Sequence, residues 1–442
     1  MAPGKTVSRS MLHRLGLVTS LLFVMAATGA CGTSTSPSGP PSGAPVANGS
    51  PWFGALTPVT LPAPVNALSA LDCPTAASCW AVGSTVGGAG ASNGAAVIAT
   101  TDGGSMWKVQ VIPATVGYLS GISCSDQRHC AAVGQAGQAP IGQGAMITTS
   151  NGGTTWTSSP PPPGILDVTA VSCRPDRRCM AMGTAALGTI ALVSVSPASG
   201  WMQVGALPAG VTGATHISCS DDQHCWVTAH TSVDVDHVAG VVVVTTNGGR
   251  TWTTLTMPTG LGYLTGVSCL SGPVAGSGAL PLPSPTTTPS STPVAPATPT
   301  TAPTTTTNGS GPTATSARVG VAGARCTVVG TTARSPGAAR TGHGLILTST
   351  NGGAHWTNQP VVASAAALTD VSCPAMDSCV AVGSSVATAT QAGVAIFTGS
   401  TDHPWKNAAV VGSAQPLSAV SCDSNSRCVV VGESTSEHLV GD

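Results

Sequence analysis

Seven pairs of cysteines, spaced at regular intervals, constrain the fold of this chain more than any other feature of its sequence. In six pairs five residues separate the cysteines, and the seventh has the same flanking residues but is split by a Thr/Pro-rich insertion. A unit that recurs about every 50 residues with its own cysteine pair is typical of a disulfide-bonded repeat protein outside the cytosol. The predicted disulfides are Cys73–Cys79, Cys124–Cys130, Cys173–Cys179, Cys219–Cys225, Cys269–Cys326, Cys373–Cys379 and Cys422–Cys428.

Zinc is the alternative to disulfides, and the cysteine spacing argues against it. Structural zinc sites commonly use cysteines two to four residues apart, together with a second cysteine or histidine pair. The paired cysteines here are five residues apart, and no second pair stands nearby in the sequence. The pattern therefore predicts disulfides and no metal site at the cysteines.

The N-terminus has the pattern of a secretory signal. Lys5, Arg9 and Arg14 precede an apolar stretch that ends at Ala30. This stretch is shorter than the roughly 20 residues of a membrane span, so residues 1–30 are predicted to be a signal peptide. The sequence TGAC at residues 28–31 resembles a bacterial lipobox, which implies lipidation of Cys31, the cysteine without a pair. The alternative is an ordinary secretory signal that leaves an unpaired thiol.

The composition favours strands and argues against nucleic acid as a partner. Residues 31–51 are rich in Ser, Gly and Pro and predict a flexible tether. After this tether Val, Ala, Thr, Ser and Gly dominate and no helical periodicity stands out, which predicts an all-β chain. Only 7% of residues are charged and the formal net charge is -1, so no basic surface is expected to hold phosphates.

Each repeat contains four segments in a constant order. The first segment ends at the first cysteine, as in Leu119–Cys124, and a five-residue polar turn leads to a second segment that begins at the partner cysteine. A third apolar run follows, for example Val241–Thr246, and a turn with a tryptophan precedes the fourth. Four strands in each of seven repeats predict a seven-bladed β-propeller of four-stranded antiparallel blades with one disulfide per blade.

The turn before the fourth segment has a second recurring pattern, Ser/Thr-x-Asp/Asn-x-Gly-x-x-Trp. The Asp or Asn side chain is expected to accept hydrogen bonds from turn amides, glycine to adopt a positive φ, and tryptophan to close over the turn. A structural role is therefore favoured over a binding site in each turn. Two further copies, Ser194–Trp201 and Thr398–Trp405, keep only the tryptophan. The four intact copies contain Asp102 and Trp107, Asn151 and Trp156, Asn247 and Trp252, and Asn351 and Trp356.

With these turns, residues 52–442 resemble the Asp-box (BNR-like) β-propellers, such as sialidases and the photosystem II assembly factor. The last repeat reaches the end of the sequence before its own turn and tryptophan. We therefore expect Trp52–Leu56 to supply the missing strand and to close the ring, which removes an open sheet edge. Trp80 and Trp226, which follow second cysteines, are predicted to pack in the core or between blades.

The insertion at residues 271–317 falls in the fifth blade, where the other repeats have a short turn. Its composition of Pro, Ser and Thr with almost no charge predicts a disordered loop tied at its base by Cys269 and Cys326. Modification by O-glycosylation and an unmodified insertion are both compatible with this composition.

The sequence offers no complete catalytic set. A sialidase requires an arginine triad and a tyrosine paired with a glutamate, but this chain has two tyrosines and no glutamate before Glu433. An acid pair for another glycosidase would have to come from a set of aspartates that no spacing rule groups. No catalytic residue is therefore predicted. The set is Asp167, Asp234, Asp236 and Asp370.

Two groups of residues are candidates for the ligand-binding face. Tyr118 and Tyr263 occupy equivalent positions in their repeats, and Asp167 is their counterpart in the third repeat. Exposed tyrosines often anchor binding partners, so these residues could form part of a binding site. The alternative is that both tyrosines have a structural role. The second group lies in the fourth repeat, where we expect a solvated loop instead of a metal site. It consists of His230, Asp234, Asp236 and His237.

Together these features predict a lipid-anchored propeller on the extracytoplasmic face of a bacterial cell membrane. We expect a monomeric, non-catalytic binding or assembly scaffold without a cofactor, whose partner is an envelope protein or a glycan. The alternative function is a carbohydrate-active hydrolase or lyase, which the Asp-box resemblance implies. A third possibility is a structural envelope protein whose Thr/Pro-rich loop is the functional part.

Overall fold

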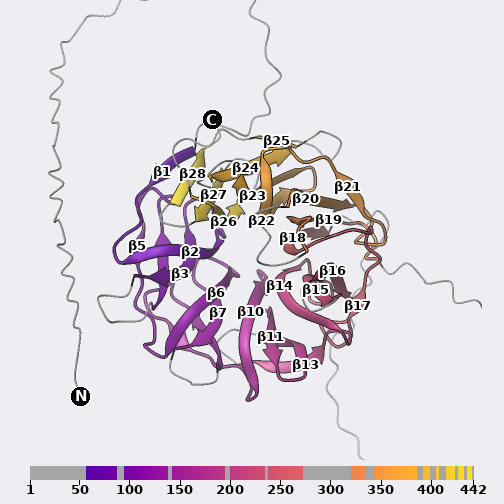
Figure 1. The fold of residues 1–442 in the computed structure, drawn as a ribbon. Helices are drawn as coiled ribbons and strands as arrows, with labels where there is room; N and C mark the ends of the chain where they lie inside the picture. Colours follow the sequence, from indigo (N-terminus) through magenta and orange to yellow (C-terminus); the bar gives the residue numbers. More distant parts are fainter. Residues whose placement is uncertain are drawn as a thin grey trace, which may run out of the picture. The chain divides into compact units, whose positions relative to one another are not determined.

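The computed structural model shows an all-β molecule in which strands surround a central axis (Figure 1). The chain divides into residues 1–48 and 49–442, and all described residues lie in the second unit. No helix among the described residues is long and apolar enough to cross a membrane. The described residues are 56–86, 94–137, 142–194, 200–233, 237–271, 320–334, 342–385, 392–398, 405–407, 415–423, 427–432 and 436–440.

Six antiparallel sheets are each formed by four strands that follow one another in the sequence, and we call them blades 1 to 6. Their strands are β2 (Val65–Asp72), β3 (Cys79–Thr85), β4 (Ala95–Thr100) and β5 (Lys108–Val109); β6 (Val116–Cys124), β7 (Cys130–Ala136), β8 (Gly144–Thr149) and β9 (Thr157–Ser158); β10 (Ile165–Cys173), β11 (Cys179–Ala185), β12 (Gly188–Ser194) and β13 (Met202–Ala206); β14 (Val211–Cys219), β15 (Cys225–Ser232), β16 (Val238–Thr245) and β17 (Thr253–Thr254); β18 (Leu264–Ser271), β19 (Ala324–Thr331), β20 (Gly344–Ser349) and β21 (Thr357–Gln359); and β22 (Ala365–Ala375), β23 (Ser378–Ser385), β24 (Gly393–Thr398) and β25 (Lys406–Asn407).

The structure corrects the prediction of seven equivalent blades, because only six blades are continuous in the chain. The last three strands, β26 (Leu417–Cys422), β27 (Arg427–Gly432) and β28 (Ser436–Val440), do not make a four-stranded unit by themselves. Their sheet is composite, since β1 (Leu56–Val59) from the other end of the chain adds its outermost strand.

The strand that completes the composite sheet also extends beyond its predicted end at Leu56. The sequence predicted Trp52–Leu56, whereas β1 spans Leu56–Val59, and residues 52–55 lie outside the described residues. Register with β28 sets this position, because Leu56 lies opposite Leu439 and Val59 opposite Ser436. A tryptophan followed by apolar residues therefore indicated that a strand was present and gave its limits only approximately.

Tight packing explains a glycine that recurs in the second strand of every blade except blade 4, which has Ala229. The first strand of blade 2 carries register shifts between Val116 and Tyr118 and between Leu119 and Gly121. A Cβ atom on Gly134 of β7 would lie 2.0 Å from the Tyr118 carbonyl oxygen. Glycine is required there because the bulged first strand approaches the backbone of the second.

The hydrophobic core consists of clusters shared by neighbouring blades. One cluster joins Trp226 and Val244 of blade 4 to Leu264 and Val328 of blade 5. The predicted inter-blade packing of Trp80 and Trp226 is confirmed, because both are buried in clusters of this kind. Each sheet therefore depends on its neighbour for burial, as expected of a propeller.

All seven predicted cysteine pairs are joined as disulfides. Each links a cysteine within two residues of the end of the first strand of a sheet to a cysteine within two residues of the start of the second. Cys269 and Cys326 are 57 positions apart, and the predicted insertion between them, except Ser271, lies outside the described residues. The signal peptide, Cys31 and the tether also lie outside the described residues, so what the sequence indicates for them stays a prediction.

Candidate functional site

The recurring turns with Asp or Asn use their polar groups within the turn. The Thr100 hydroxyl donates to Asp102 Oδ1 at 2.7 Å, and the same oxygen accepts the Met106 amide at 3.0 Å. Gly103 and Gly104 have φ values of 73° and 88°. The pKa of Asp102 is below its usual value because of the bonds from Met106 and Thr100. These contacts give the turn a structural role.

The other three intact turns repeat this geometry with asparagine. Their Thr or Ser hydroxyl lies 2.9–3.0 Å from the Oδ1 atom of Asn151, Asn247 or Asn351. In all four turns the tryptophan is buried, as are Trp201 and Trp405 of the two degenerate copies. The turn residues are Asp102, Trp107, Asn151, Trp156, Asn247, Trp252, Asn351 and Trp356.

A ring of hydrogen bonds next to the disulfides joins every sheet to the next. The residue before each first cysteine accepts a hydrogen bond from the backbone amide of the first cysteine in the following sheet. The bonds are Cys124 to Asp72, Cys173 to Ser123, Cys219 to Ser172, Cys269 to Ser218, Cys373 to Ser268, Cys422 to Ser372 and Cys73 to Ser421. We call these seven bonds the amide ring.

Sequence analysis missed the amide ring, although its signal was present. Serine precedes the first cysteine in six repeats and Asp72 does so in the first. Burial raises the pKa of Asp72 to about 6, against the opposing effect of hydrogen bonds from Cys124, Ser123 and Cys73. Blade 1 thus places a titratable group where the other sheets have a neutral hydroxyl.

The centre of the ring contains a small polar cavity of about 110 Å³. Hydroxyls of the innermost strands line it, and several donate to carbonyls of the neighbouring sheet. The Thr215 hydroxyl lies 2.9 Å from the Leu264 carbonyl, and the Thr369 hydroxyl 2.8 Å from the Leu417 carbonyl. These hydroxyls therefore link the sheets a second time, nearer to the axis.

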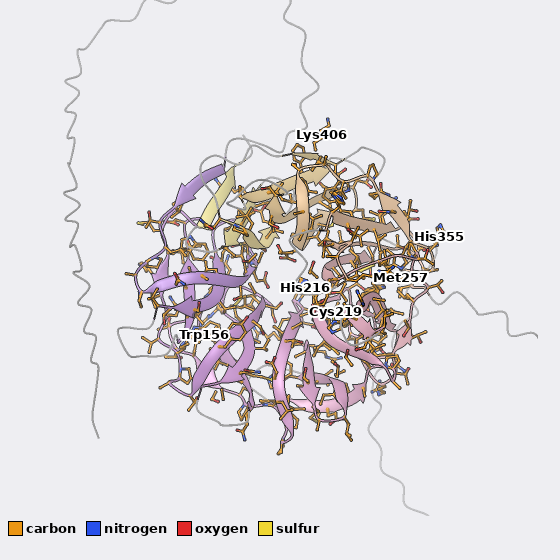
Figure 2. All side chains as sticks on the ribbon, viewed as in Figure 1. Trp156, His216, Cys219, Met257, His355 and Lys406 are labelled. Atoms are coloured by element: carbon orange, nitrogen blue, oxygen red, sulfur yellow. A yellow bond between two sulfur atoms is a disulfide. The ribbon has the colours of Figure 1, made fainter. Side chains whose placement is uncertain are left out.

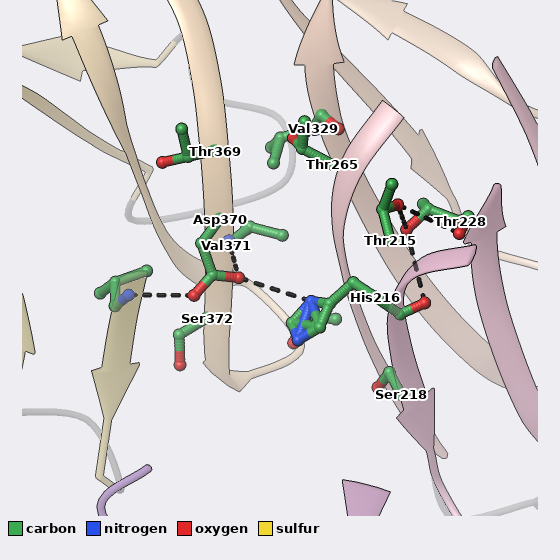
Figure 3. A network of polar contacts seen from close by, with 12 residues as sticks. Thr215, His216, Ser218, Thr228, Thr265, Val329, Thr369, Asp370, Val371 and Ser372 are labelled. Carbon is green, nitrogen blue, oxygen red and sulfur yellow. Dashed lines mark hydrogen bonds and ion pairs between the residues drawn. The ribbon is translucent and has the colours of Figure 1, made fainter. Parts of the chain in front are cut away.

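His216 lies near the centre of the ring of strands (Figure 2) and faces Asp370 in this central cavity (Figure 3). The Nδ1 atom of His216 lies 3.6 Å from Oδ1 of Asp370, so the pair joins blade 4 to blade 6. Burial raises the pKa of Asp370, while His216 and the amides of Val420 and Val371 oppose the shift. The Val420 amide donates to Oδ2 at 3.0 Å and the Val371 amide to Oδ1 at 2.8 Å.

The predicted ligand-face residues lie at or next to the start of the innermost strands. Tyr118 of β6 is 45% exposed, whereas Tyr263 is half-buried with its ring centroid 5.0 Å from that of His230. Burial raises the pKa of Asp167 and lowers that of His230. The structure therefore brings Tyr263 together with His230, but gives no contact that joins Tyr118, Tyr263 and Asp167 into one site.

The other predicted candidates are not assembled into a site. Asp234 and Asp236 lie outside the described residues, and His237 stands just before β16. The described residues contain no group of three His, Cys, Asp or Glu side chains that could hold a metal ion. Asp370 and Asp167 occupy different blades and do not form an acid pair. The side chain of Asp370 contacts His216.

A larger hollow, which the sequence analysis did not identify, lies between blades 3 and 4 on the side of the disulfides. Its volume is about 270 Å³, and we call it the 3/4 groove. Met180, Val193, Met202 and Val204 provide its apolar surface, and Met202 is 59% exposed. Charged residues at its edge are Arg174, Arg178, Arg250, Asp221 and Asp222.

The charges around the 3/4 groove are only partly paired. Arg174 lies 2.6 Å from Asp176, and Arg178 lies 2.9 Å from Asp222. Arg250 is exposed and donates to the Asn247 carbonyl at 3.0 Å, and no acidic partner for it occurs among the described residues. The groove therefore combines an apolar floor with an available positive charge.

The equivalent place between blades 4 and 5 is filled by a tryptophan. Trp226 has no exposed surface, and its Nε1 donates to the Gly352 carbonyl at 3.0 Å. Trp80 fills the place between blades 1 and 2, where a Cβ on Gly153 would lie 3.1 Å from its Nε1. Met180 follows the second cysteine of blade 3 as these tryptophans do in theirs, so this position was the available sequence signal.

Comparisons with known proteins show the fold and no family. No protein-family model matches this sequence, and no curated protein matches it. A solved structure of YCF48 bound to D1 peptide is similar with a TM-score of 0.53 at 11% identity, over 90% of this chain and 100% of that chain. A GH74 enzyme from Niastella koreensis has a TM-score of 0.53 at 10% identity, over 84% of this chain and 51% of that chain.

Virginiamycin B lyase from Staphylococcus aureus, solved as a catalytically inactive variant with quinupristin, is a third similar structure. Its TM-score is 0.51 at 10% identity, over 87% of this chain and 98% of that chain. At such identities the similarity establishes the all-β propeller fold. The three similar structures include one peptide complex and two enzymes, so the fold alone is compatible with binding and with catalysis.

Proposed function

We propose that this chain is a lipid-anchored, extracytoplasmic propeller that acts as a non-catalytic binding scaffold at a bacterial cell envelope. Its ligand is a polypeptide segment of an envelope protein, held in the 3/4 groove. The observation that carries this proposal is the combination of an open apolar floor with Arg250 at its edge. Exposed apolar surface next to an available charge is typical of sites that bind proteins.

The chemistry of the groove favours a polypeptide over a glycan. Its floor consists of Met and Val side chains, and the described lining includes no aromatic ring on which a sugar would stack. Methionine side chains are flexible and adapt to different apolar partners. An apolar side chain from a partner would therefore be accommodated there without strain.

The positions of the inner carboxylates support a non-catalytic role. Asp72 accepts the Cys124 amide in the amide ring, and Asp370 accepts two backbone amides in the central cavity. These carboxylates satisfy backbone donors where sheets meet. Removal of either carboxylate would therefore affect the stability of the protein. Buried carboxylates that accept hydrogen bonds usually have this structural role.

Site-specific photo-cross-linking in cells tests the proposed function. A photoreactive residue replaces Met202 in the groove or, as a control, Val111, which is 83% exposed in the segment between β5 and β6. We expect one defined envelope protein to be linked from position 202 and not from 111. Identical products from both positions would contradict the proposal. Loss of the product in the Tyr118→Ala, Tyr263→Ala double variant would move the site to the predicted ligand face.

The lipid anchor is tested separately at Cys31. The wild-type chain is expected in the membrane fraction with a mass increase on its N-terminal peptide, whereas Cys31→Ser should lack that modification. A wild-type N-terminal peptide with an unmodified Cys31 thiol would contradict the lipid anchor and favour an ordinary secretory signal.

A second candidate function rests on the His216–Asp370 pair. His216 and Asp370 lie 3.6 Å apart in a polar cavity and are residue types that act as general acids and bases in hydrolases and lyases. Envelope glycans incubated with the wild-type chain distinguish the two functions. Cleavage that disappears in Asp370→Asn or His216→Gln would overturn the scaffold, and we expect no cleavage by the wild-type chain.

A further inference from the structure

We infer that the 3/4 groove receives a tryptophan side chain of the partner, with an acidic residue next to it in the partner sequence. This inference rests on the proposed function and names the chemistry of its ligand. It follows from a comparison of the groove with the places that Trp80 and Trp226 fill in the same molecule.

The backbone around the groove matches that around the buried tryptophans. Met180 directly follows Cys179 at the start of β11, as Trp226 directly follows Cys225 at the start of β15. Each of the two residues faces a glycine-containing turn of the next blade. A Cβ on Gly249 would lie 3.1 Å from the Met180 Cε atom, and Trp226 donates to the Gly352 carbonyl. Methionine is smaller than tryptophan, so a groove remains.

An acceptor for an indole N–H is present at the equivalent position. Gly248 is the counterpart of Gly352 in the turn sequence and lines the 3/4 groove. The Gly352 carbonyl accepts the Trp226 Nε1 hydrogen at 3.0 Å. Trp226 makes this bond, whereas the Nε1 of Trp80 has no hydrogen-bond partner among the described residues. An indole from a partner that lay in the groove as Trp226 lies in its own junction would reach the Gly248 carbonyl, which favours tryptophan over phenylalanine or leucine.

The apolar walls also suit an aromatic ring. Met180, Met202 and Val204 all line the groove. Thioether sulfur atoms make favourable contacts with aromatic rings, worth about 0.3–1.5 kcal/mol each. The exposed Met202 would lose its contact with water when a ring covered it, which adds a hydrophobic contribution.

Arg250 specifies the neighbouring charge. Two of the three arginines at the groove form ion pairs with aspartates, whereas Arg250 has only a carbonyl partner among the described residues. A carboxylate on the partner would form a charge-assisted hydrogen bond with its guanidinium. The preferred ligand is therefore a segment with tryptophan and aspartate or glutamate adjacent.

Calorimetric titration of the full chain with the peptide acetyl-Gly-Trp-Asp-Gly-amide tests this inference. Leucine in place of Trp should weaken binding about tenfold or more, since buried aromatic anchors dominate such sites. Asparagine in place of Asp should weaken it about threefold at low salt and less at high salt. Equal binding of the leucine peptide and the tryptophan peptide would overturn the inference.

Protein variants locate the binding. Met180→Trp fills the groove from within and should abolish binding. Met202→Glu alters an exposed residue that should not affect folding, and it should also abolish binding. Arg250→Gln should reproduce the effect of the asparagine peptide, whereas Arg177→Gln, on the same face but outside the groove lining, should bind as the wild type does. Unchanged binding by Met202→Glu would contradict the inference.

The outcome for the ligand is separable from the outcome for the function. If cross-linking from position 202 succeeds and the tryptophan peptide does not bind, the groove holds a partner by another side chain and this inference alone is wrong. If neither occurs, both the proposed function and this inference are wrong.

Discussion

The junction between blades 3 and 4 and the junction between blades 4 and 5 are bounded by the same backbone elements. They differ in the side chain that occupies the space between the blades. Both lie beside disulfides and beneath a turn that contains two consecutive glycines. Between blades 4 and 5 Trp226 is fully buried, whereas between blades 3 and 4 Met180 leaves a groove of about 270 Å³. Trp226 thus makes the space at its junction part of the core, whereas the space beside Met180 is open to a ligand.

A third place shows that a small residue alone does not create such a groove. Between blades 5 and 6 Thr327 stands where Met180 stands, yet the hollow there measures only about 10 Å³. Arg325 spans this junction in an ion pair with Asp377 at 2.6 Å. The open space between blades 3 and 4 is therefore a particular property of that junction.

Truncation of the two residues that distinguish the junctions should give the largest effect. Trp226→Ala removes a fully buried ring and should destabilise the protein by about 3–5 kcal/mol. Met180→Ala, next to a space that is already open, should cost about 2 kcal/mol, at the lower end of the range for methionine. Guanidinium unfolding without reductant measures both values, and equal losses would contradict the distinction between core and groove.

The pH dependence of stability should distinguish Asp72 from the serines that take its place in the rest of the amide ring. Burial raises the pKa of Asp72 from 3.8 to about 6, so the folded state holds this proton more tightly than the unfolded chain. The stabilisation is therefore complete below pH 3.8 and is lost as the pH rises through about 6, by roughly 2–3 kcal/mol.

Asp72→Ser, which introduces the residue of the other six repeats, tests this prediction. Its free energy of unfolding relative to the wild type should increase by about 2–3 kcal/mol between pH 4 and pH 8. Asp370 and Asp167 remain in both proteins, so their titration cancels in the difference. A difference that does not change with pH would show that Asp72 titrates normally.

The amide ring should contribute equally beneath the open and the filled junction. The Cys219 amide lies 3.2 Å from the Ser172 hydroxyl, and the Cys269 amide lies 3.0 Å from the Ser218 hydroxyl. Ser172→Ala and Ser218→Ala should each cost about 1 kcal/mol, because each leaves a partly buried amide without its acceptor. A much smaller loss for Ser172→Ala would indicate that the groove admits water to that amide.

The smallest effect on stability is expected at Arg250. Its side chain is exposed and forms no ion pair among the described residues, so Arg250→Gln should change the free energy of unfolding by less than about 0.5 kcal/mol. The same substitution should weaken binding of the Trp-Asp peptide. A loss of stability as large as that of Ser172→Ala would assign Arg250 a structural role.

Patterns that are local in the sequence predicted the fold well. The cysteine spacing gave the disulfides, and the turn pattern gave the position of the fourth strand, because both depend on residues a few positions apart. The strand-forming composition, the lack of helical periodicity and the order of segments predicted all-β, four-stranded antiparallel sheets. The composite sheet was anticipated, but its added strand runs to Val59, past the predicted end at Leu56, because that end depends on register with β28.

The candidate sites depend on contacts between repeats, and most of them were missed. His216 and Asp370 meet only because blades 4 and 6 face the same axis across Gly266, whose added Cβ would lie 3.0 Å from the Asp370 Cα atom. The serine before each first cysteine recurs in the sequence, but its acceptor role requires the neighbouring sheet. The sequence shows tryptophan after the second cysteine in only two repeats and Met180 in the third, but whether a groove remains beside Met180 depends on the packing of the neighbouring blade.

Methionine methyl NMR tests the central claim most directly. With labelled methyl groups, the Trp-Asp peptide should shift the Cε signals of Met180 and Met202 and give intermolecular NOEs from the indole ring to both. Met376, which lines the nearly closed junction of blades 5 and 6, is the internal control and should not shift. Shifts at Met376 or elsewhere without shifts at Met180 and Met202 would contradict the account.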